Sequence, residues 1–270
     1  MEKQISSSPS KFNSLFAAIV IPATIIVAIL LYMFVLGNPA NFEGNDPNNH
    51  PKPGNYFGTV YKGGFIVPIL MSFFLMVLTF SIERFITIRL AYGNGGLDKF
   101  VLKIKNYLGK NDLDSAFKEC DRQKGAVGNV VYSVLNKYEH LITEPGLNKD
   151  QKIVALQKEL EEATSLELPM LEKNLTIIAT LASVATLVGL LGTVIGMIKA
   201  FAALATAGAP DAVALANGIS EALINTALGI STSALAIIAY NYFTSQIDTL
   251  TYSIDESGFS ITQNFATTQS

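Results

Sequence analysis

The fold is decided by two long apolar segments, LASVATLVGLLGTVIGMIKAF at residues 181–201 and GISEALINTALG at residues 218–229. No charged residue occurs from 174 to 198 or from 222 to 247. Each of these charge-free stretches exceeds the roughly 20 apolar residues that an α-helix needs to cross a bilayer. The sequence therefore predicts two consecutive membrane spans joined by a short loop.

Two further apolar stretches without charge precede this pair, at residues 12–42 and 63–82. The first is longer than a signal-peptide core and no A-x-A-like site follows it, so we expect an uncleaved helix. Half of the residues are hydrophobic, only 15% are charged, and the mean hydropathy is +0.37. Such a composition suits a chain that is part membrane span and part soluble domain. The predicted fold class is all-α, a polytopic membrane protein with four transmembrane helices and a helical cytoplasmic subdomain.

Basic residues set the expected orientation, because cytoplasmic loops carry an excess of Lys and Arg. Most of the lysines and arginines lie between Arg89 and Lys173, whereas the connection between the first two spans has only Lys52 and Lys62. Both chain ends are then expected in the cytoplasm. The expected parts are a cytoplasmic N-terminus (1–11), a first span (12–36), a periplasmic loop (37–62), a second span (63–88), a cytoplasmic domain (89–173), a third span (174–204), a periplasmic loop (205–212), a fourth span (213–246) and a cytoplasmic tail (247–270).

The expected cytoplasmic segment has the pattern of a small helical subdomain. Apolar residues recur every three or four positions, and Gly109, Gly125 and Pro145-Gly146 interrupt the pattern. The acidic run Glu159-Leu160-Glu161-Glu162 is more typical of a solvated helix face than of a binding site. Four helices are predicted, over residues 97–108, 112–123, 127–141 and 149–171.

Several classes of function find no support in the composition. The net charge of −3 does not favour nucleic acid, and the single Cys120 excludes an intramolecular disulfide and lacks the partners of a zinc site. His50 and His140 lie far apart, without metal-ligand spacing. Gly192-Thr193-Val194 lacks the Lys-Ser/Thr of a phosphate-binding loop and lies within a span. We therefore expect no metal, no cofactor, no nucleic acid and no enzymatic activity.

Small and hydroxyl residues recur at helical spacing along the last two spans. The steps of four and three residues connect Ala182, Thr186, Gly189, Thr193, Gly196 and Ala200 on the third span and Ala222, Thr226, Gly229, Ser233 and Ala236 on the fourth. Small residues let membrane helices approach closely. Close packing is therefore one interpretation for Gly189, Gly192, Gly196, Gly229 and Ser233. The other interpretation is that the two faces line a narrow space.

Glu221 is the ionisable residue that lies deepest in these spans. About ten residues, or roughly 15 Å of regular helix, separate it from Asp211. A carboxylate at that depth is costly unless it faces protein, water or a partner charge, so it indicates an ion or proton route. Two alternatives stay open: the helix begins later and leaves Glu221 near the interface, and Thr193 and Thr226 bond only to their own helix.

Residues 159–246 resemble the ExbB/TolQ/MotA proton-channel family, with ExbB of the TonB system as the most similar form. The quoted segments 181–201 and 218–229 carry the resemblance. It extends more weakly back to residue 63, through Ser81-Ile82-Glu83-Arg84-Phe85 and Ala116-Phe117-Lys118-Glu119-Cys120.

The resemblance implies a stator subunit of an energy-coupling motor in a Gram-negative inner membrane. Family members form a homo-oligomeric ring, a pentamer, around a dimer of a single-span ExbD-like partner whose membrane aspartate carries the proton. Thr193 and Thr226 match threonines that face this partner, and Glu221 matches a carboxylate that lines the same interior. Thr186 and Asn225 are assigned to the pore lining with them. A TonB-like protein would then transmit the work to the outer membrane.

Two features depart from the family. Thr186 and Leu235 stand where many members have proline, and the span at 12–36 with its loop has no counterpart in the three-span form. A TolQ-type subunit of the Tol-Pal envelope-constriction system and a non-conducting membrane scaffold remain as alternatives. A MotA-like flagellar stator fits less well, because the cytoplasmic segment is short.

Overall fold

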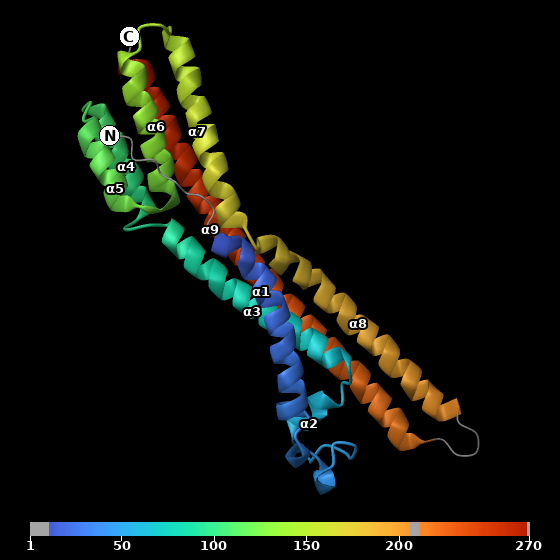
Figure 1. Cartoon of the computed structure of the whole chain (residues 1–270). Helices are drawn as coiled ribbons and strands as arrows, with labels where there is room; N and C mark the ends of the chain where they lie inside the picture. The colour runs from blue at the N-terminus through green and yellow to red at the C-terminus, as the bar shows by residue number, and fades with distance from the viewer. Residues whose placement is uncertain (1–10, 206–210, 269–270) are drawn as a thin grey trace. The chain divides into compact units, whose positions relative to one another are not determined.

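The computed structural model describes residues 11–205 and 211–268. These residues form helices, and the only β pairing among them is an isolated antiparallel bridge between Phe42 and Pro51. The chain divides into two compact units, one made of the segment up to residue 81 with residues 176–240, the other of residues 82–175 with the segment from 241 onward (Figure 1).

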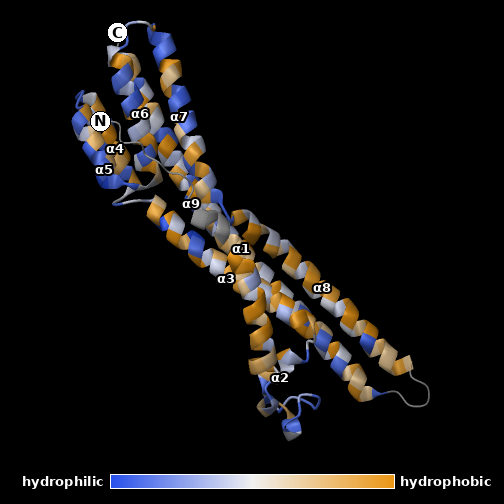
Figure 2. Cartoon of the chain, in the orientation of Figure 1, coloured by the Kyte–Doolittle hydropathy of each residue, from blue (hydrophilic) through white to orange (hydrophobic). Residues whose placement is uncertain are grey.

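Four segments of the described chain are long and apolar enough to cross a membrane: Phe16–Leu36, Ile66–Ala91, Lys149–Ala205 and Ala212–Thr268. Figure 2 shows apolar residues concentrated on α1 (Lys11–Leu30) and α8 (Leu175–Ala205). The protein is thus an all-α polytopic membrane protein, as predicted. Each of the four predicted spans overlaps one of these segments, whereas the loop predicted at 205–212 lies mostly outside the described residues.

The connection that follows α1 has a small core of its own. After a π-helical turn at Leu31–Leu36 come two 3-10 turns, Pro39–Asn41 and Glu43–Asn45, and the short helix α2, Tyr56–Tyr61. Phe42 is fully buried, with the Tyr61 ring 5.4 Å away and the Lys62 ammonium 5.5 Å from its ring centre. The Tyr61 ring also stacks on the Tyr32 ring, with 4.7 Å between the ring centres. Aromatic packing therefore connects the end of the first span to the chain just before α3 (Ile66–Ala91).

The second unit contains four amphipathic helices, in the places that the periodicity predicts. They are α4 (Leu97–Gly109), α5 (Leu113–Gln123), α6 (Gly125–Thr143) and α7 (Lys149–Glu172). Asp112 caps α5 by accepting a hydrogen bond from the Ser115 amide, and Asn148 with Gln151 forms a capping box on α7. The helix ends differ from the predicted ones by at most two residues, because caps and glycines are local signals.

The C-terminal segment, predicted only as a tail, is instead the end of one long helix, α9 (Ala212–Thr268). Within the second unit its inner face is buried at steps of three and four residues, including Ile247, Leu250, Ile254, Ile261 and Phe265. The Tyr138 hydroxyl donates to Asn264 Oδ1 at 2.9 Å, and the Tyr138 ring meets Phe265 edge-on. Apolar residues recur at helical spacing in this segment, which explains why it is helical and packed.

Arg84 stabilises the end of α7. It is only 2% exposed, pairs with Glu83, and donates to the carbonyl oxygens of Met170 and Leu171 at 3.1 and 3.0 Å. Asn174, whose φ is +65°, ends the helical path after α7 and donates to Glu83 at 3.2 Å. The carbonyls that a helix end leaves without partners are thus satisfied by a buried cation.

Candidate functional site

Helices α8 and α9 contact each other along a line of small residues. A Cβ atom added to Gly196 would lie 2.7 Å from the carbonyl oxygen of Gly218, and one added to Gly192 would collide with Asn225. At Gly196 backbone therefore meets backbone, and at Gly192 backbone meets the Asn225 side chain, approaches that glycine allows. The buried line consists of Ala185, Gly189, Gly192, Gly196 and Ala200 on α8 and of Gly218, Ala222, Asn225, Gly229 and Ser233 on α9.

All five residues proposed for helix packing lie in this contact line. A Cβ on Gly229 would be 2.7 Å from the Ala185 carbonyl oxygen, and one on Gly189 would be 3.1 Å from the Gly229 Cα. The Ser233 hydroxyl adds a hydrogen bond across the helices, because it donates to the carbonyl oxygen of Ala182. Along the contact line, small residues pack the two helices together and one hydroxyl bonds across them.

The threonines lie beside this line and not in it. The predicted stripe placed Thr186 and Thr193 among the glycines, but the buried positions are Ala185 and Gly192, one residue and about 100° away on the helix. Thr186, Thr193 and Thr226 are each half-buried. The difference between the predicted and the buried stripe has a simple cause. The two stripes are adjacent on α8, and both follow steps of four and three residues. Only contact with the partner helix α9 selects between them.

The hydroxyls of Thr193 and Thr226 bond to their own helices. Thr193 donates to the Leu190 carbonyl at 2.5 Å, and Thr226 donates to the Ala222 carbonyl at 3.2 Å. This is the alternative that the sequence left open. Each hydroxyl oxygen still has lone pairs, so both threonines can accept a hydrogen bond from another group.

Glu221 forms an ion pair with Lys199 of the facing helix. The Lys199 Nζ lies 2.6 Å from Oε1 and 2.9 Å from Oε2 of Glu221. Glu221 is 7% exposed, whereas the Lys199 side chain is 51% exposed. A Cβ on Gly64, whose φ is +77°, would lie 2.5 Å from Glu221 Oε1. The carboxylate is therefore enclosed between a cation and the backbone of the turn that precedes α3.

Sequence analysis assigns no role to Lys199, the residue that follows the charge-free stretch at 174–198. A usable signal was present: opposite charges interrupt two spans that a short loop joins, so they occur at comparable depth once the spans pair. A cation near a membrane carboxylate is the partner that such a group requires.

Asn225 differs from its expected pore-lining position. Its side chain is fully buried inside the protomer, where it fills the space beside Gly192 and donates to the Gly63 carbonyl at 2.9 Å. Its Oδ1 atom has no partner among the described residues. Asn225 thus connects α9 to the turn before α3 and presents no surface in this protomer.

The predicted pore-lining residues consequently fall into two groups. Glu221 and Thr226 are five residues apart, which separates them by about 140° around α9. The same helical geometry puts Thr193 and Thr226 on one side of the contact line and the Lys199–Glu221 ion pair on the other. One side of the contact line presents hydroxyls, and the other side carries the ion pair.

The described residues contain no cluster of three or more His, Cys, Asp or Glu side chains that could hold a metal ion. Fold and site together define a class: a multi-span helical membrane protein whose last two spans pair closely, with hydroxyls on one side and an ion pair on the other.

Comparison with known proteins shows which family of membrane proteins this chain is similar to. A model of the MotA/TolQ/ExbB proton channel family matches residues 123–256, a segment just short of half of the chain. The match contains the ion pair, both threonines and the whole contact line.

Individual relatives come from two branches of the family. The Tol-Pal system protein TolQ of Pseudomonas aeruginosa is 36% identical over 114 residues, which cover 42% of this chain and 49% of the relative. The biopolymer transport protein ExbB of Helicobacter pylori is 42% identical over 80 residues, 30% of this chain and 55% of the relative. ExbB of Xanthomonas campestris is 35% identical over 88 residues, 33% of this chain and 35% of the relative. The chain spans about half or less of the length of most of these relatives.

Proposed function

We propose that this chain is a proton-channel stator subunit of an inner-membrane energy-coupling motor. In this proposal it works with an ExbD-like single-span partner to drive TonB-dependent transport across the outer membrane. One observation carries the proposal: the family-matched segment pairs α8 with α9 so closely that Thr193 and Thr226 share one side of the contact line.

The hydrogen bonds of these threonines suit a carrier that alternates between two protonation states. Because Thr193 and Thr226 donate to carbonyls of their own helices, their oxygens remain as acceptors. A protonated carboxylic acid on a partner helix can donate to such an oxygen, whereas a carboxylate has no proton to donate. The threonines would therefore hold the neutral acid and favour release of the charged form.

The ion pair has a complementary role in the proposal. Glu221 and Lys199 cancel each other's charge within the paired spans, so a proton carrier nearby meets little net charge. The enclosure of the carboxylate by Lys199 and Gly64 also fixes the start of α3 against α9. Opening this pair would expose one charge of each sign, which gives the site two distinct states.

The proposal includes assembly into a homo-oligomeric ring, a pentamer as in the family, and the surfaces that one protomer leaves uncovered support it. Large apolar side chains are exposed on α8 and α9, among them Leu187, Val194 and Leu223. In the proposed arrangement α8 and α9 are innermost, α1 and α3 face lipid, and both chain ends are cytoplasmic, in keeping with the distribution of basic residues.

The test is complementation in a Gram-negative host that lacks its own energising proteins. The chain is expressed with its ExbD-like partner and a TonB-like protein, and uptake driven by the proton motive force is measured, with an uncoupler as control. Restored, uncoupler-sensitive uptake supports the proposal. Absence of uptake in cells that retain the assembled complex would contradict it.

A TolQ-type subunit is the second candidate, because the match to a TolQ protein extends over 114 residues. The same cells provide its test when the chain is expressed with a single-span partner of the Tol-Pal system and envelope constriction is scored. Restored constriction without uptake would favour this function, and a complex active in neither assay would favour a non-conducting scaffold.

A further inference from the structure

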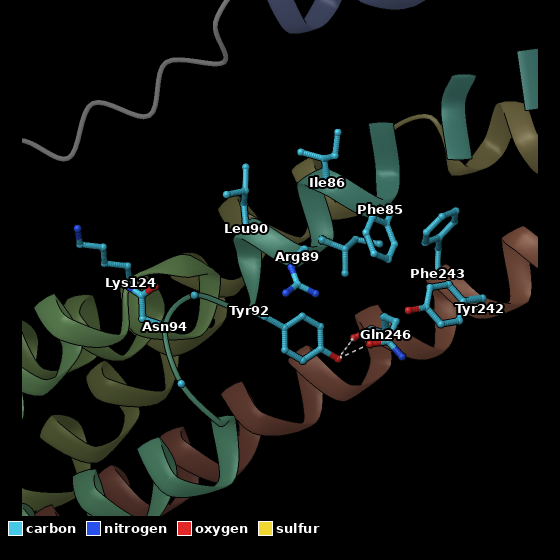
Figure 3. Close-up of a pocket in the computed structure, with 13 residues that line it drawn as sticks. Phe85, Ile86, Arg89, Leu90, Tyr92, Asn94, Lys124, Tyr242, Phe243 and Gln246 are labelled. Atoms are coloured by element: carbon cyan, nitrogen blue, oxygen red, sulfur yellow. Dashed lines mark hydrogen bonds between the residues drawn. The ribbon is translucent and has the colours of Figure 1, made fainter. Parts of the chain in front are cut away.

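The second unit contains a cavity of about 830 Å³ that the function above does not use. The last turns of α3, the loop that follows it and residues 242–246 of α9 form most of its wall (Figure 3). Arg89 extends into it among Tyr92, Tyr242 and Gln246 (Figure 3).

The charged residues that line this cavity are all basic. Arg89 and Lys124 line it, and its wall contains no Asp or Glu side chain. In the part of the chain that the structure describes, neither of these two side chains forms an ion pair. An unpaired guanidinium with a planar set of donors is suited to phosphate or carboxylate groups. The cavity therefore selects for an anion.

Part of the remaining wall is apolar and exposed. Phe85 and Ile86 are about half exposed and Leu90 is 72% exposed, all on the last turns of α3. Tyr92 donates to Gln246 Oε1 at 2.9 Å, and desolvation raises the pKa of its hydroxyl above the ordinary value. Two tyrosines next to a helix end are typical of a membrane interface. An anion with an apolar tail matches this wall better than a free anion does.

We propose that this cavity binds one anionic phospholipid per subunit, with its phosphate on Arg89 and its acyl chains along Phe85, Ile86 and Leu90. Lys124, at the rim, adds a second and weaker attraction. Basic pockets at the ends of membrane helices are known to hold anionic headgroups. The inference rests only on α3 crossing a bilayer and is independent of which transport system the protein serves.

The experiment measures lipid bound to the intact complex. The full chain with its partner is purified and placed in nanodiscs made of equal parts phosphatidylglycerol and phosphatidylcholine, and spin-labelled forms of each lipid report their relative affinity. We expect preference for phosphatidylglycerol, reduced about fivefold in Arg89→Gln, as loss of one cation near an anionic headgroup predicts. Lys124→Gln should reduce it less, and Arg89→Lys should retain part of it.

Lys105→Gln, a charge change on an exposed position of α4, is the matched control and should leave the preference unchanged. All variants are compared at equal assembly, judged by size-exclusion chromatography. An unchanged preference in Arg89→Gln would overturn the inference. So would efficient crosslinking between subunits in a Leu90→Cys variant, because a second copy would then cover the wall that the acyl chains need.

Discussion

The Nζ atom of Lys199 lies within hydrogen-bond distance of both carboxylate oxygens of Glu221, 2.6 and 2.9 Å away, across the contact between α8 and α9. Each residue alone would be a charge in an apolar span, and together they are neutral. The proposed role of Glu221 in a proton route must therefore be separated from its role as the partner of Lys199.

Glu221→Gln should lower both the thermal stability of the complex and its proton-driven uptake, because it leaves Lys199 without its counter-charge. In the double variant Lys199→Gln, Glu221→Gln no charge is left unpaired, and we expect the unfolding midpoint to recover while uptake stays lost. Thermal unfolding in detergent and uptake assays measure the two effects. Recovery of uptake in the double variant would show that Glu221 serves only to neutralise Lys199.

Gly192→Ala should destabilise the α8–α9 pair, because the added methyl group would overlap Asn225. Overpacking of this kind typically costs about 1 to 3 kcal/mol. Gly109→Ala is the control, since nothing lies within 4 Å of the methyl group that it adds. The unfolding midpoint of the purified protein decides the matter, and equal midpoints for the two variants would mean that the contact is looser than described.

The double variant Thr193→Val, Thr226→Val should lose most of its uptake but keep its partner. Valine resembles threonine in shape and lacks the oxygen, so a buried acid on the partner helix would lose an acceptor at a cost of about 1 to 3 kcal/mol. Thr180→Val, at an exposed hydroxyl that bonds to its own α8 helix, is the matched control. Co-purification and uptake are measured together. Full activity would assign the two threonines to packing alone, and loss of the partner would make them structural.

Cys120 should resist alkylation in the folded protein. It is buried, and desolvation raises the pKa of its thiol to about 12, so the reactive thiolate is scarce at neutral pH. Because the thiolate is the basic form, reactivity should rise with pH and remain low at pH 8. Mass spectrometry after iodoacetamide treatment, with and without denaturant, is the measurement. Rapid labelling of the native protein would contradict the packing of α5.

Arg84→Ala should destabilise the second unit by about 3 to 5 kcal/mol, because it removes the buried cation that pairs with Glu83 and donates to two α7 carbonyls. Arg122→Ala, which removes an exposed arginine from a pair with Glu119, should cost less than about 1 kcal/mol. Glu119 also retains Lys103. Denaturant unfolding of both variants gives the comparison, and similar losses would show that Arg84 is no more than a surface charge.

Local patterns in the sequence determined the elements. A charge-free run long enough to cross a bilayer depends only on its own residues, so each predicted span corresponds to an apolar helix. The caps at Asp112 and Asn148 and the break at Gly109 are local as well, which is why the predicted cytoplasmic helices agree with the structure to within two residues. The family resemblance likewise came from contiguous residues.

Only the tertiary structure decided which side chains meet. Steps of four and three residues fit two adjacent stripes on α8 equally well, and contact with α9 selected Ala185 and Gly192 in place of Thr186 and Thr193. The bond from Asn225 to the Gly63 carbonyl joins residues 162 positions apart, and no local pattern encodes it. The rotation of one helix against another depends on the shapes of both surfaces at once, and a single strip of sequence contains only one of them.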